Sequence, residues 1–363
     1  KTSILSALTC YQNSIFYQNN YWAGTKWGHH LVGRVIFFSC LMIKLSINAD
    51  SIGIDTFLLD DNLKLYIAAI IKDEYSSLLE WIAYHRVLGV DGFIIADNGS
   101  RDGSRELLLS LARLGIVKMF DQPILVNQKP QLPAYEHILR SCPRDIDLLA
   151  FIDADEFLLP LESDTKLSDF FSEKFQDESV SAIALNWANF GSSGELFAEE
   201  GLVIERFTYR APQPFNVHHN FKSVVKPERV NRFHNPHYAD LRYGRYIDVL
   251  GRDLILHPRH GKGVSAEVIW SGVRVNHYAV KSLEEFLLGK HLRGSAATAN
   301  RVKHKDYFKA HDRNDEECLL AAAFSGQVKA EMERLSVKLT ELSAVEPIPT
   351  GSWFKKKMKK WMV

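Results

Sequence analysis

The sequence predicts an α/β protein built on a mostly parallel sheet that is flanked by helices. From residue 63 onward, short apolar runs alternate with segments of helical periodicity, in the order strand, helix, strand, helix, strand. Parallel strands need a long crossover, which is usually a helix, so this alternation favours parallel pairing. In addition, residues 148–152 are consecutively apolar, which is typical of a strand buried on both faces.

The predicted elements follow one another closely along the chain. Residues 65–71 form the first strand, and apolar residues at helical spacing predict a helix from residue 75 to 87, which Gly89 is placed to end. Then come a strand at 92–96, a helix at 105–114 closed by Gly115, and a strand at 116–120. A loop over 121–133 and a short helix lead to the fourth strand, at 148–152.

Acidic residues follow three of these four strands: Asp73 and Glu74, then Asp97, then Asp153 and Asp155. The carboxyl ends of parallel strands share one edge of a sheet, where open α/β sheets bind ligands. Acids that converge there repel one another unless a cation or donor groups offset their charge. On an extended segment Asp153 and Asp155 project to one side and Glu156 to the other, so a divalent cation between the two aspartates is the simplest interpretation. The alternative is a solvated turn or a helix cap.

The chain beyond residue 160 is less regular. We expect a helix at 167–175 and a strand at 180–185, followed by Trp187 and Phe190 beside a Gly-Ser turn. These aromatic rings suit either a platform for sugar stacking or core packing. Ser282 and Glu285 form a capping box that opens a basic helix over 283–293, and residues 314–342 are predicted to be mainly helical.

Composition excludes several classes of protein. Lys plus Arg and Asp plus Glu number 44 each, so no global basic field implies a nucleic-acid partner. The four cysteines are scattered without a CxxC pair, which argues against a disulfide scaffold or zinc ribbon and fits a reducing, cytoplasmic compartment. Residues 31–47 are mostly apolar, but Arg34 and Lys44 leave an uninterrupted run shorter than the roughly 20 residues that a spanning helix needs. A buried helix or strand is favoured there over a membrane-associated segment.

The last residues, 353–363, interleave lysines with tryptophan and phenylalanine. Such a composition suits attachment to an anionic membrane surface, and the alternative is a solubilising tail without fixed structure. We therefore expect a cytoplasmic protein that lies peripherally at the inner face of a membrane.

Three motifs in sequence order carry a family resemblance: KDE at residues 72–74, ADNGSRDGS at 96–104 and FIDADEF at 151–157. Together they resemble the nucleotide-sugar-binding half of the GT-A fold glycosyltransferases, most of all family 2 and its relatives in family 92. Asp73 stands where those families usually have Asn, and Asn98 stands where many members carry a second Asp. The resemblance covers roughly residues 63–315.

The resemblance also implies roles for individual residues, which we expect as follows. The nucleotide-sugar donor is contacted by Asp73, Glu74, Asp97, Asp153 and Lys222. A Mn²⁺ or Mg²⁺ ion is held by Asp153 and Asp155, with His237 or His277 as a further ligand. Each histidine has a structural alternative, and a solvated side chain is the default for Lys222. Glu195 is the named candidate for the catalytic base, although the acidic pair that family 2 members place on a later helix is not found.

The function implied is a metal-dependent glycosyltransferase that moves a sugar from a nucleoside diphosphate-sugar to a glycan or lipid-linked acceptor, with inversion. The chain then divides into an N-terminal extension (1–62), a nucleotide-sugar-binding half (63–160), an acceptor-side half of the same domain (161–280), a helical region (281–345) and a basic aromatic tail (346–363). A nucleotidyltransferase on a similar fold and a non-catalytic glycan-binding relative are the alternatives. A phosphatase of the haloacid dehalogenase type is disfavoured, because Phe157 stands where it needs Thr or Val.

Overall fold

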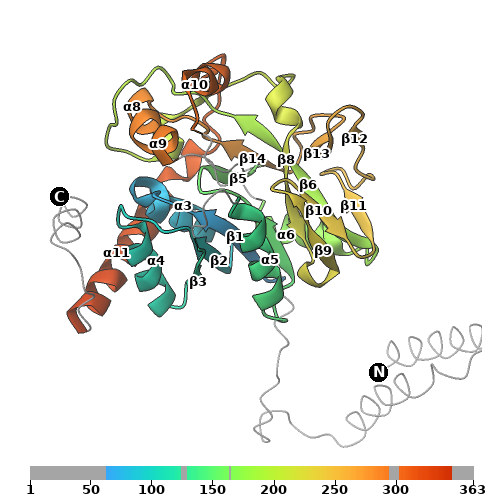
Figure 1. Ribbon diagram of the computed structural model, residues 1–363, viewed down its shortest axis with the longest axis horizontal. Helices are drawn as coiled ribbons and strands as arrows, with labels where there is room; N and C mark the ends of the chain where they lie inside the picture. Colours follow the sequence, from blue (N-terminus) through green and yellow to red (C-terminus); the bar gives the residue numbers. More distant parts are fainter. Residues whose placement is uncertain (1–62, 124–128, 163–164, 294–301, 346–363) are drawn as a thin grey trace, which may run out of the picture. The chain divides into compact units, whose positions relative to one another are not determined.

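The computed structural model describes residues 63–123, 129–162, 165–293 and 302–345 (Figure 1). The predictions made for residues 31–47 and 353–363 lie outside these described residues. Within the described ranges, no helix combines the length and the apolar character needed to cross a membrane.

A nine-stranded mixed sheet organises the fold, in the order β3-β2-β1-β4-β8-β6-β14-β5, with β11 paired to β6. Its first four strands are parallel: β3 (Val117–Asp121), β2 (Gly92–Asp97), β1 (Leu65–Ile71) and β4 (Leu148–Phe151). The remaining strands are β8 (Phe221–Val225), β6 (Val180–Asn189), β14 (Val273–His277), β5 (Glu156–Pro160) and β11 (Arg245–Ile247). Here β8 is antiparallel to β4 and β6, and β5 is antiparallel to β14, while β14 and β11 run parallel to β6.

Helices cover both faces of the parallel part of the sheet. Ile67 and Ala69 of β1 belong to the core cluster that includes α3 (Tyr75–Val87) and α4 (Ser104–Arg113). Ala68 and Ile70 belong to a second cluster with α5 (Gln131–Ser141). Because successive strand residues point to opposite faces, the uninterrupted apolar run of β1 is explained by burial on both sides.

The other helices and helical turns are shorter, except the last. They are α6 (Leu167–Phe175), α7 (Val203–Arg206), the 3₁₀ turns Asn216–His219, Pro227–Arg229 and Ala322–Phe324, α8 (Leu283–Glu285), the π-helical turn Phe286–Lys290, α9 (His291–Arg293), α10 (Lys305–His311) and α11 (Ser325–Val345). Helix α11 packs along α3, where Arg86 Nε lies 2.7 Å from Glu331 Oε1. Helices α8, α9 and α10 gather at one end of the molecule, beyond β5 and β14 (Figure 1).

Three small two-stranded sheets complete the described part of the chain. They pair β9 (Val230–Asn235) with β10 (Tyr238–Leu241), β12 (Leu256–His257) with β13 (Gly261–Ser265), and β7 (Tyr209–Arg210) with β15 (Glu316–Glu317).

The predicted α/β architecture with a helical C-terminal region is confirmed, with local corrections. Helix α5 begins at Gln131, before the predicted end of the loop, and β6 extends to Asn189, beyond the predicted residue 185. Trp187 and Phe190 are 8% and 0% exposed, so both pack in the core and neither offers a face for sugar stacking. The predicted helix over 314–342 is interrupted by β15 and a 3₁₀ turn before α11 begins.

The segment between β4 and β5 differs most from expectation. Asp153 and Asp155 do not lie on one extended strand, because the chain turns at residues 154–155 and β5 starts at Glu156. Glu156 was expected to point away from Asp153, yet Glu156 Oε2 accepts the Asp153 backbone N–H at 2.8 Å. The turn therefore brings the carboxyl group of Glu156 back toward Asp153.

Candidate functional site

The predicted acids converge where β1, β2 and β4 end. We call this group the acid edge: Asp73, Glu74, Asp97, Asp153, Asp155 and Glu156. The loops after β1 and β2 are bonded to each other, since Asp73 Oδ1 accepts the Arg101 N–H at 2.7 Å and the Glu74 N–H donates to Ser104 Oγ at 2.9 Å. Asp73 adopts a positive φ of 52°, an uncommon conformation for a residue other than glycine. The parallel sheet thus brings together acids that are far apart in sequence, as predicted.

Asp97 is engaged within its own turn. Its side chain is 1% exposed, and Oδ2 accepts the backbone N–H groups of Gly99 at 3.1 Å and Ser100 at 3.2 Å. Burial raises the pKa of Asp97, and the hydrogen bonds from Ser100 act in the opposite direction. These bonds from an aspartate to the backbone two and three residues ahead form an Asx turn. A contact between Asp97 and a base or ribose stays a prediction.

Asp153 is held by a buried lysine. Lys222, on β8, is 0% exposed, and its ammonium lies 2.8 Å from Asp153 Oδ2 and 3.2 Å from Glu156 Oε2. The second oxygen, Asp153 Oδ1, accepts a hydrogen bond from Gln131 Nε2 at 2.8 Å. The sequence offered a solvated side chain as the default for Lys222, but it is one of the core residues of the site. Its predicted contact with a donor diphosphate stays a prediction.

The charges of this trio follow from its burial. Burial raises the pKa of Glu156 to about 8, against the pull of Lys222, so this carboxyl group is mostly neutral at pH 7. Burial also opposes ionisation of Asp153, but Lys222 holds the pKa of Asp153 below its ordinary value. The ammonium of Lys222 stays charged, because its two carboxyl neighbours outweigh burial and raise its pKa. At neutral pH the trio is therefore an ion pair between the buried Lys222 and the partly exposed Asp153, beside a protonated Glu156.

Asp155 has a second, separate cation. The Lys290 ammonium contacts Asp155 Oδ2 and also donates to the carbonyl of Ala279 at 2.9 Å. His277, at the end of β14, places Nε2 3.7 Å from the same carboxylate oxygen. Burial disfavours the charge, but Lys290 and His277 together hold the pKa of Asp155 well below its usual range. Asp155 is thus an anion whose neighbours are a lysine and a histidine.

The two predicted histidine ligands both contact the ring of Trp187. The ring centroid of Trp187 is 4.3 Å from that of His277 and 5.0 Å from that of His237. His237 Nδ1 lies 3.0 Å from the Phe221 carbonyl oxygen, and burial lowers the pKa of His237 to about 3, so its ring is neutral. Burial likewise lowers the pKa of His277. Of the two, His277 is the one in contact range of a predicted metal-binding aspartate.

Glu74 is covered by the basic segment at 281–293. Arg293 contacts the Glu74 carboxylate, and its Nη1 also donates to the carbonyls of Lys72 at 3.0 Å and Asp73 at 2.8 Å. Lys281 Nζ lies 3.9 Å from Glu74 Oε2. The capping box predicted at Ser282 and Glu285 is present and begins this segment. The sequence marked the segment as basic, but gave no indication that its cations reach the acid edge.

Glu195, the candidate base, is paired with an arginine. Arg206 Nη2 lies 2.6 Å from Glu195 Oε2 and 2.9 Å from Glu285 Oε2. The Leu283 N–H donates to the Glu195 carbonyl at 3.2 Å, so Glu195 adjoins the start of α8. Its role as base stays a prediction.

The donor set at Asp155 fits a small divalent cation. Among the described residues no three His, Cys, Asp or Glu side chains form a metal-binding cluster. However, Mg²⁺ and similar ions are commonly held by one or two protein ligands together with substrate phosphates and water. His277 is 5% exposed, and within the described part of the chain its Nδ1 has no hydrogen-bond partner. An aspartate oxygen and an imidazole nitrogen are suitable ligands for Mn²⁺, and the diphosphate would supply the rest.

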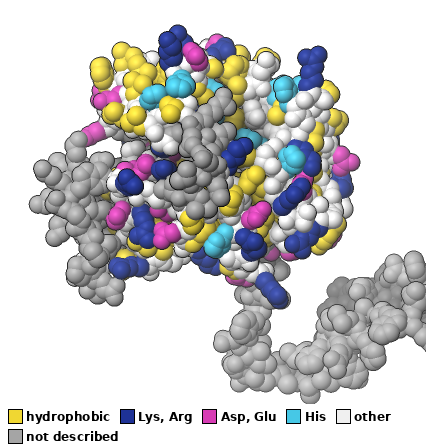
Figure 2. Space-filling model, viewed as in Figure 1, with side chains coloured by type: hydrophobic (Ala, Val, Ile, Leu, Met, Phe, Trp, Pro, Cys, Tyr) yellow, Lys and Arg dark blue, Asp and Glu magenta, His cyan; other side chains and the backbone are white. Residues whose placement is uncertain are grey.

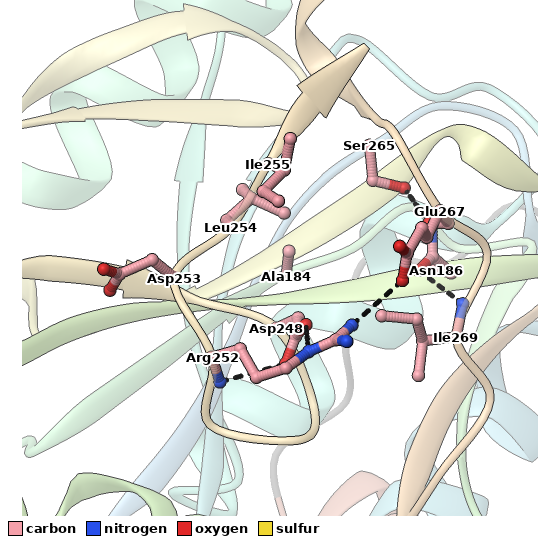
Figure 3. Close-up of a pocket in the computed structure, with 10 residues that line it drawn as sticks. All are labelled: Ala184, Asn186, Asp248, Arg252, Asp253, Leu254, Ile255, Ser265, Glu267 and Ile269. Atoms are coloured by element: carbon pink, nitrogen blue, oxygen red, sulfur yellow. Dashed lines mark hydrogen bonds and ion pairs between the residues drawn. The ribbon is translucent and has the colours of Figure 1, made fainter.

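A small pocket lies elsewhere, lined by Ala184 and Asn186 of β6 and by residues between 248 and 269 (Figure 3). Asn186 lines it, whereas the next residue, Trp187, points to the histidines described above. Arg252 is neutralised there by Asp248 at 2.8 Å and by Glu267 at 3.0 Å. Because its charges pair with one another and it contains none of the acid edge, this pocket is not part of the candidate site.

Apolar side chains are exposed around α8 and α9, where Figure 2 shows them gathered on one end of the molecule. They are Leu196, Phe197, Leu287, Leu288 and Leu292, each between 45% and 69% exposed. We call this group the leucine patch. The Glu284 N–H donates to the Leu196 carbonyl at 3.0 Å, which joins its two sequence segments.

Comparison with known proteins identifies related sequences. The family model described as glycosyltransferase family 92 matches residues 69–260, which is more than half of the chain. A family 92 protein of Oryza sativa subsp. japonica is 24% identical over 247 residues, covering 66% of this chain and 41% of that protein. A family 92 protein of Ricinus communis is 27% identical over 191 residues, covering 51% of this chain and 33% of that protein. The chain therefore spans less than half the length of these curated relatives.

Solved structures with partial similarity include S. aureus TarS 1-349 in complex with UDP-GlcNAc, with 8% identity, a TM-score of 0.30 and coverage of 46% of each chain. Another is glucosyl-3-phosphoglycerate synthase from Mycobacterium tuberculosis in complex with Mn²⁺, UDP-glucose and phosphoglyceric acid. It has 13% identity and a TM-score of 0.28, and the match covers 46% of this chain and 58% of that chain.

Proposed function

Because the chain belongs to glycosyltransferase family 92, we propose that it transfers a sugar from a nucleoside diphosphate-sugar to a glycan or lipid-linked acceptor, with a divalent cation and with inversion. The observation that carries the proposal is the pair Asp155 and His277 at the carboxyl edge of the sheet, where His277 Nε2 lies 3.7 Å from Asp155 Oδ2. A buried carboxylate that is kept ionised by neighbouring cations is suited to hold a metal against a diphosphate.

We assign a role in this reaction to each group of residues at the acid edge. Asp153 and Asp155, with His277, would hold the Mn²⁺ or Mg²⁺ ion, and Lys222 and Gln131 fix the orientation of Asp153. When bound, the ion neutralises the charge that develops on the departing nucleoside diphosphate. The loops after β1 and β2, with Asp73, Glu74 and Asp97, face the nucleotide. Glu195 accepts the proton of the acceptor hydroxyl, which attacks the anomeric carbon from the face opposite the leaving group.

The leucine patch supports a lipid-linked acceptor. Leu287, Leu288 and Leu292 lie on the same helical segment as Lys290 and Arg293, which contact the acid edge. Exposed apolar surface next to a polar site commonly marks contact with an apolar partner. The patch and the basic aromatic tail at 353–363 together support a protein that works peripherally at the cytoplasmic face of a membrane.

A panel of nucleoside diphosphate-sugars tests the proposal. We expect at least one donor to raise the melting temperature in the presence of Mn²⁺ and to release nucleoside diphosphate when acceptor glycans are added. Asp155→Asn should abolish both effects. The matched control is Asp145→Asn, which removes an exposed acid at the opposite end of β4, where Asp145 pairs with Lys64, and should behave as the wild type. If no donor shifts the melting temperature with any metal, the glycosyltransferase proposal is wrong.

A further inference from the structure

Lys290 occupies the position at Asp155 where a metal ion would bind. Its ammonium contacts Asp155 Oδ2, the oxygen that also faces His277 Nε2 at 3.7 Å. The contact is well supported, because the same ammonium donates to the Ala279 carbonyl at 2.9 Å and lies 5.6 Å from the centre of the Tyr307 ring. Only 13% of the Lys290 side chain is exposed. The cation at this carboxylate is therefore supplied by the chain itself.

The backbone around Lys290 is unusual. Lys290 ends the π-helical turn Phe286–Lys290, which interrupts the helix between α8 and α9. Such widened turns inside helices are rare and often occur at functional sites. Here the turn positions Lys290 against Asp155, while Arg293 in α9 contacts Glu74. One short segment thus places cations on two separate parts of the acid edge.

The imidazole of His277 is the second observation that points to a metal ion. It is 5% exposed, and its Nε2 faces Asp155 Oδ2 at 3.7 Å, beyond normal hydrogen-bond length, so a small cation between the two atoms could take both as ligands. Among the described residues the Lys290 ammonium is hydrogen-bonded to Asp155 and to the Ala279 carbonyl and not to His277, whereas a divalent cation can take Asp155 Oδ2 and the lone pair of His277 Nε2 as ligands together. Lys290 neutralises the charge of Asp155 but does not bind the imidazole of His277.

We infer that Lys290 is a built-in substitute for the metal ion: it neutralises Asp155 while donor and metal are absent, and it and a divalent cation exclude each other at this carboxylate. The inference rests on the proposed metal role of Asp155 and adds a competitor from the chain itself. Two cations cannot contact one carboxylate oxygen at close range without strong repulsion. Metal binding must therefore displace the ammonium, which remains tethered beside the position of the diphosphate.

Direct Mn²⁺ binding to the donor-free protein tests the inference. The signal of free aqueous Mn²⁺ in electron paramagnetic resonance gives the bound fraction for the wild type, Lys290→Met and Lys303→Met. Lys303 is the matched control, because its ammonium lies over the same Tyr307 ring, 4.1 Å from its centre, but contacts no carboxylate within the described residues. Burial lowers the pKa of Lys303 to about 7, so the titrations are run at pH 6, where both lysines are charged. We expect Lys290→Met to bind Mn²⁺ at least tenfold more tightly than wild type, about 1.4 kcal/mol, and Lys303→Met less than threefold.

The outcomes separate this inference from the proposed function. If wild type and Lys290→Met bind Mn²⁺ equally well, Lys290 is no competitor, and the metal role of Asp155 stands. If the two lysine variants gain equally, the effect is one of overall charge and the inference is wrong. If neither the wild type nor Lys290→Met binds Mn²⁺, with or without the donor panel, both ideas fail.

A measurement on the wild type avoids any concern about the folding of the variant. A brief pulse of an amine-acylating reagent, followed by mass spectrometry, reports how accessible each lysine ammonium is. Adding Mn²⁺ should increase the labelling of Lys290 several-fold relative to Lys309, an exposed lysine of α10. Labelling of Lys290 that does not change at saturating Mn²⁺ would overturn the inference.

Discussion

Replacing Lys222 by methionine removes the buried cation that holds the first aspartate of the acid edge. Methionine fills nearly the same space, so packing changes little and the effect reports on charge. In the wild type the ammonium is 0% exposed and lies 2.8 Å from Asp153 and 3.2 Å from Glu156. In Lys222→Met the Asp153 carboxylate keeps only the hydrogen bond from Gln131 on its other oxygen.

The expected loss of stability follows from the state of each carboxyl group. Breaking a buried ion pair by removing one partner costs roughly 3–5 kcal/mol. Glu156, with its pKa raised to about 8 by burial, is already mostly neutral at pH 7 and adds little to this loss. The Asp153 side chain is 33% exposed, so water relieves part of the penalty. We therefore expect Lys222→Met to lower the free energy of unfolding by about 3 kcal/mol, the lower end of that range.

Urea denaturation of a double-mutant cycle measures the interaction. The variants are Lys222→Met, Asp153→Asn and the double variant, with Glu156→Gln as the control for a carboxyl group that is already neutral. The double variant should be more stable than the sum of the single effects predicts, by roughly 2 kcal/mol, because no charge is left unpaired. Glu156→Gln should change the unfolding free energy by less than about 1 kcal/mol.

The pH dependence has a definite sign. The folded-state pKa of Asp153 is lowered from its ordinary value of 3.8, so the stability it contributes is present above pH 3.8 and is lost as the pH falls through the folded value. The deficit of Lys222→Met should therefore shrink in acid. A loss below about 1 kcal/mol at pH 7, or single effects that simply add, would refute the proposed ion pair.

Two further predictions concern residues that support the site. Glu80 is buried against α7, where its carboxylate accepts the Val203 N–H at 2.8 Å and the Ile204 N–H at 3.2 Å, and burial raises the pKa of Glu80 to about 7. Between pH 4.5 and 7 the folded protein therefore keeps a proton on Glu80 that the unfolded chain has lost. As the pH rises across that window, the unfolding free energy of the wild type relative to Glu80→Gln should fall by about 3 kcal/mol and then level off. Urea titrations at several pH values measure this difference, and a constant difference would contradict the prediction. Ser282→Ala removes the hydroxyl that accepts the Glu285 N–H at 3.2 Å and should lower the unfolding free energy by about 1 kcal/mol. Amide hydrogen exchange should speed up in residues 283–293, and unchanged exchange there would argue against the capping box.

The sequence predicts the parallel half of the sheet well because its signals are local. In β1 and β4, every residue faces a helix-covered side, so the apolar run itself marks the strand. Gly89 and Gly115 end their helices with φ values of 87° and 72°, a conformation that glycine adopts readily. The antiparallel pairing of β8 between β4 and β6 has no such signal, because it depends on contacts between segments that are distant in sequence.

In the candidate site, too, some residues could be predicted from local sequence signals and others depend on contacts between distant segments. Its acids could be predicted because each directly follows a strand, and topology alone brings strand ends together. Its cations could not: Lys222 lies 69 residues from Asp153, Lys290 lies 135 from Asp155, and Arg293 lies 219 from Glu74. No periodicity or turn chemistry connects such positions. From the sequence, the acid edge therefore required an external counter-ion, whereas the folded chain supplies its own cations, and the question for experiment becomes which of them a metal ion replaces.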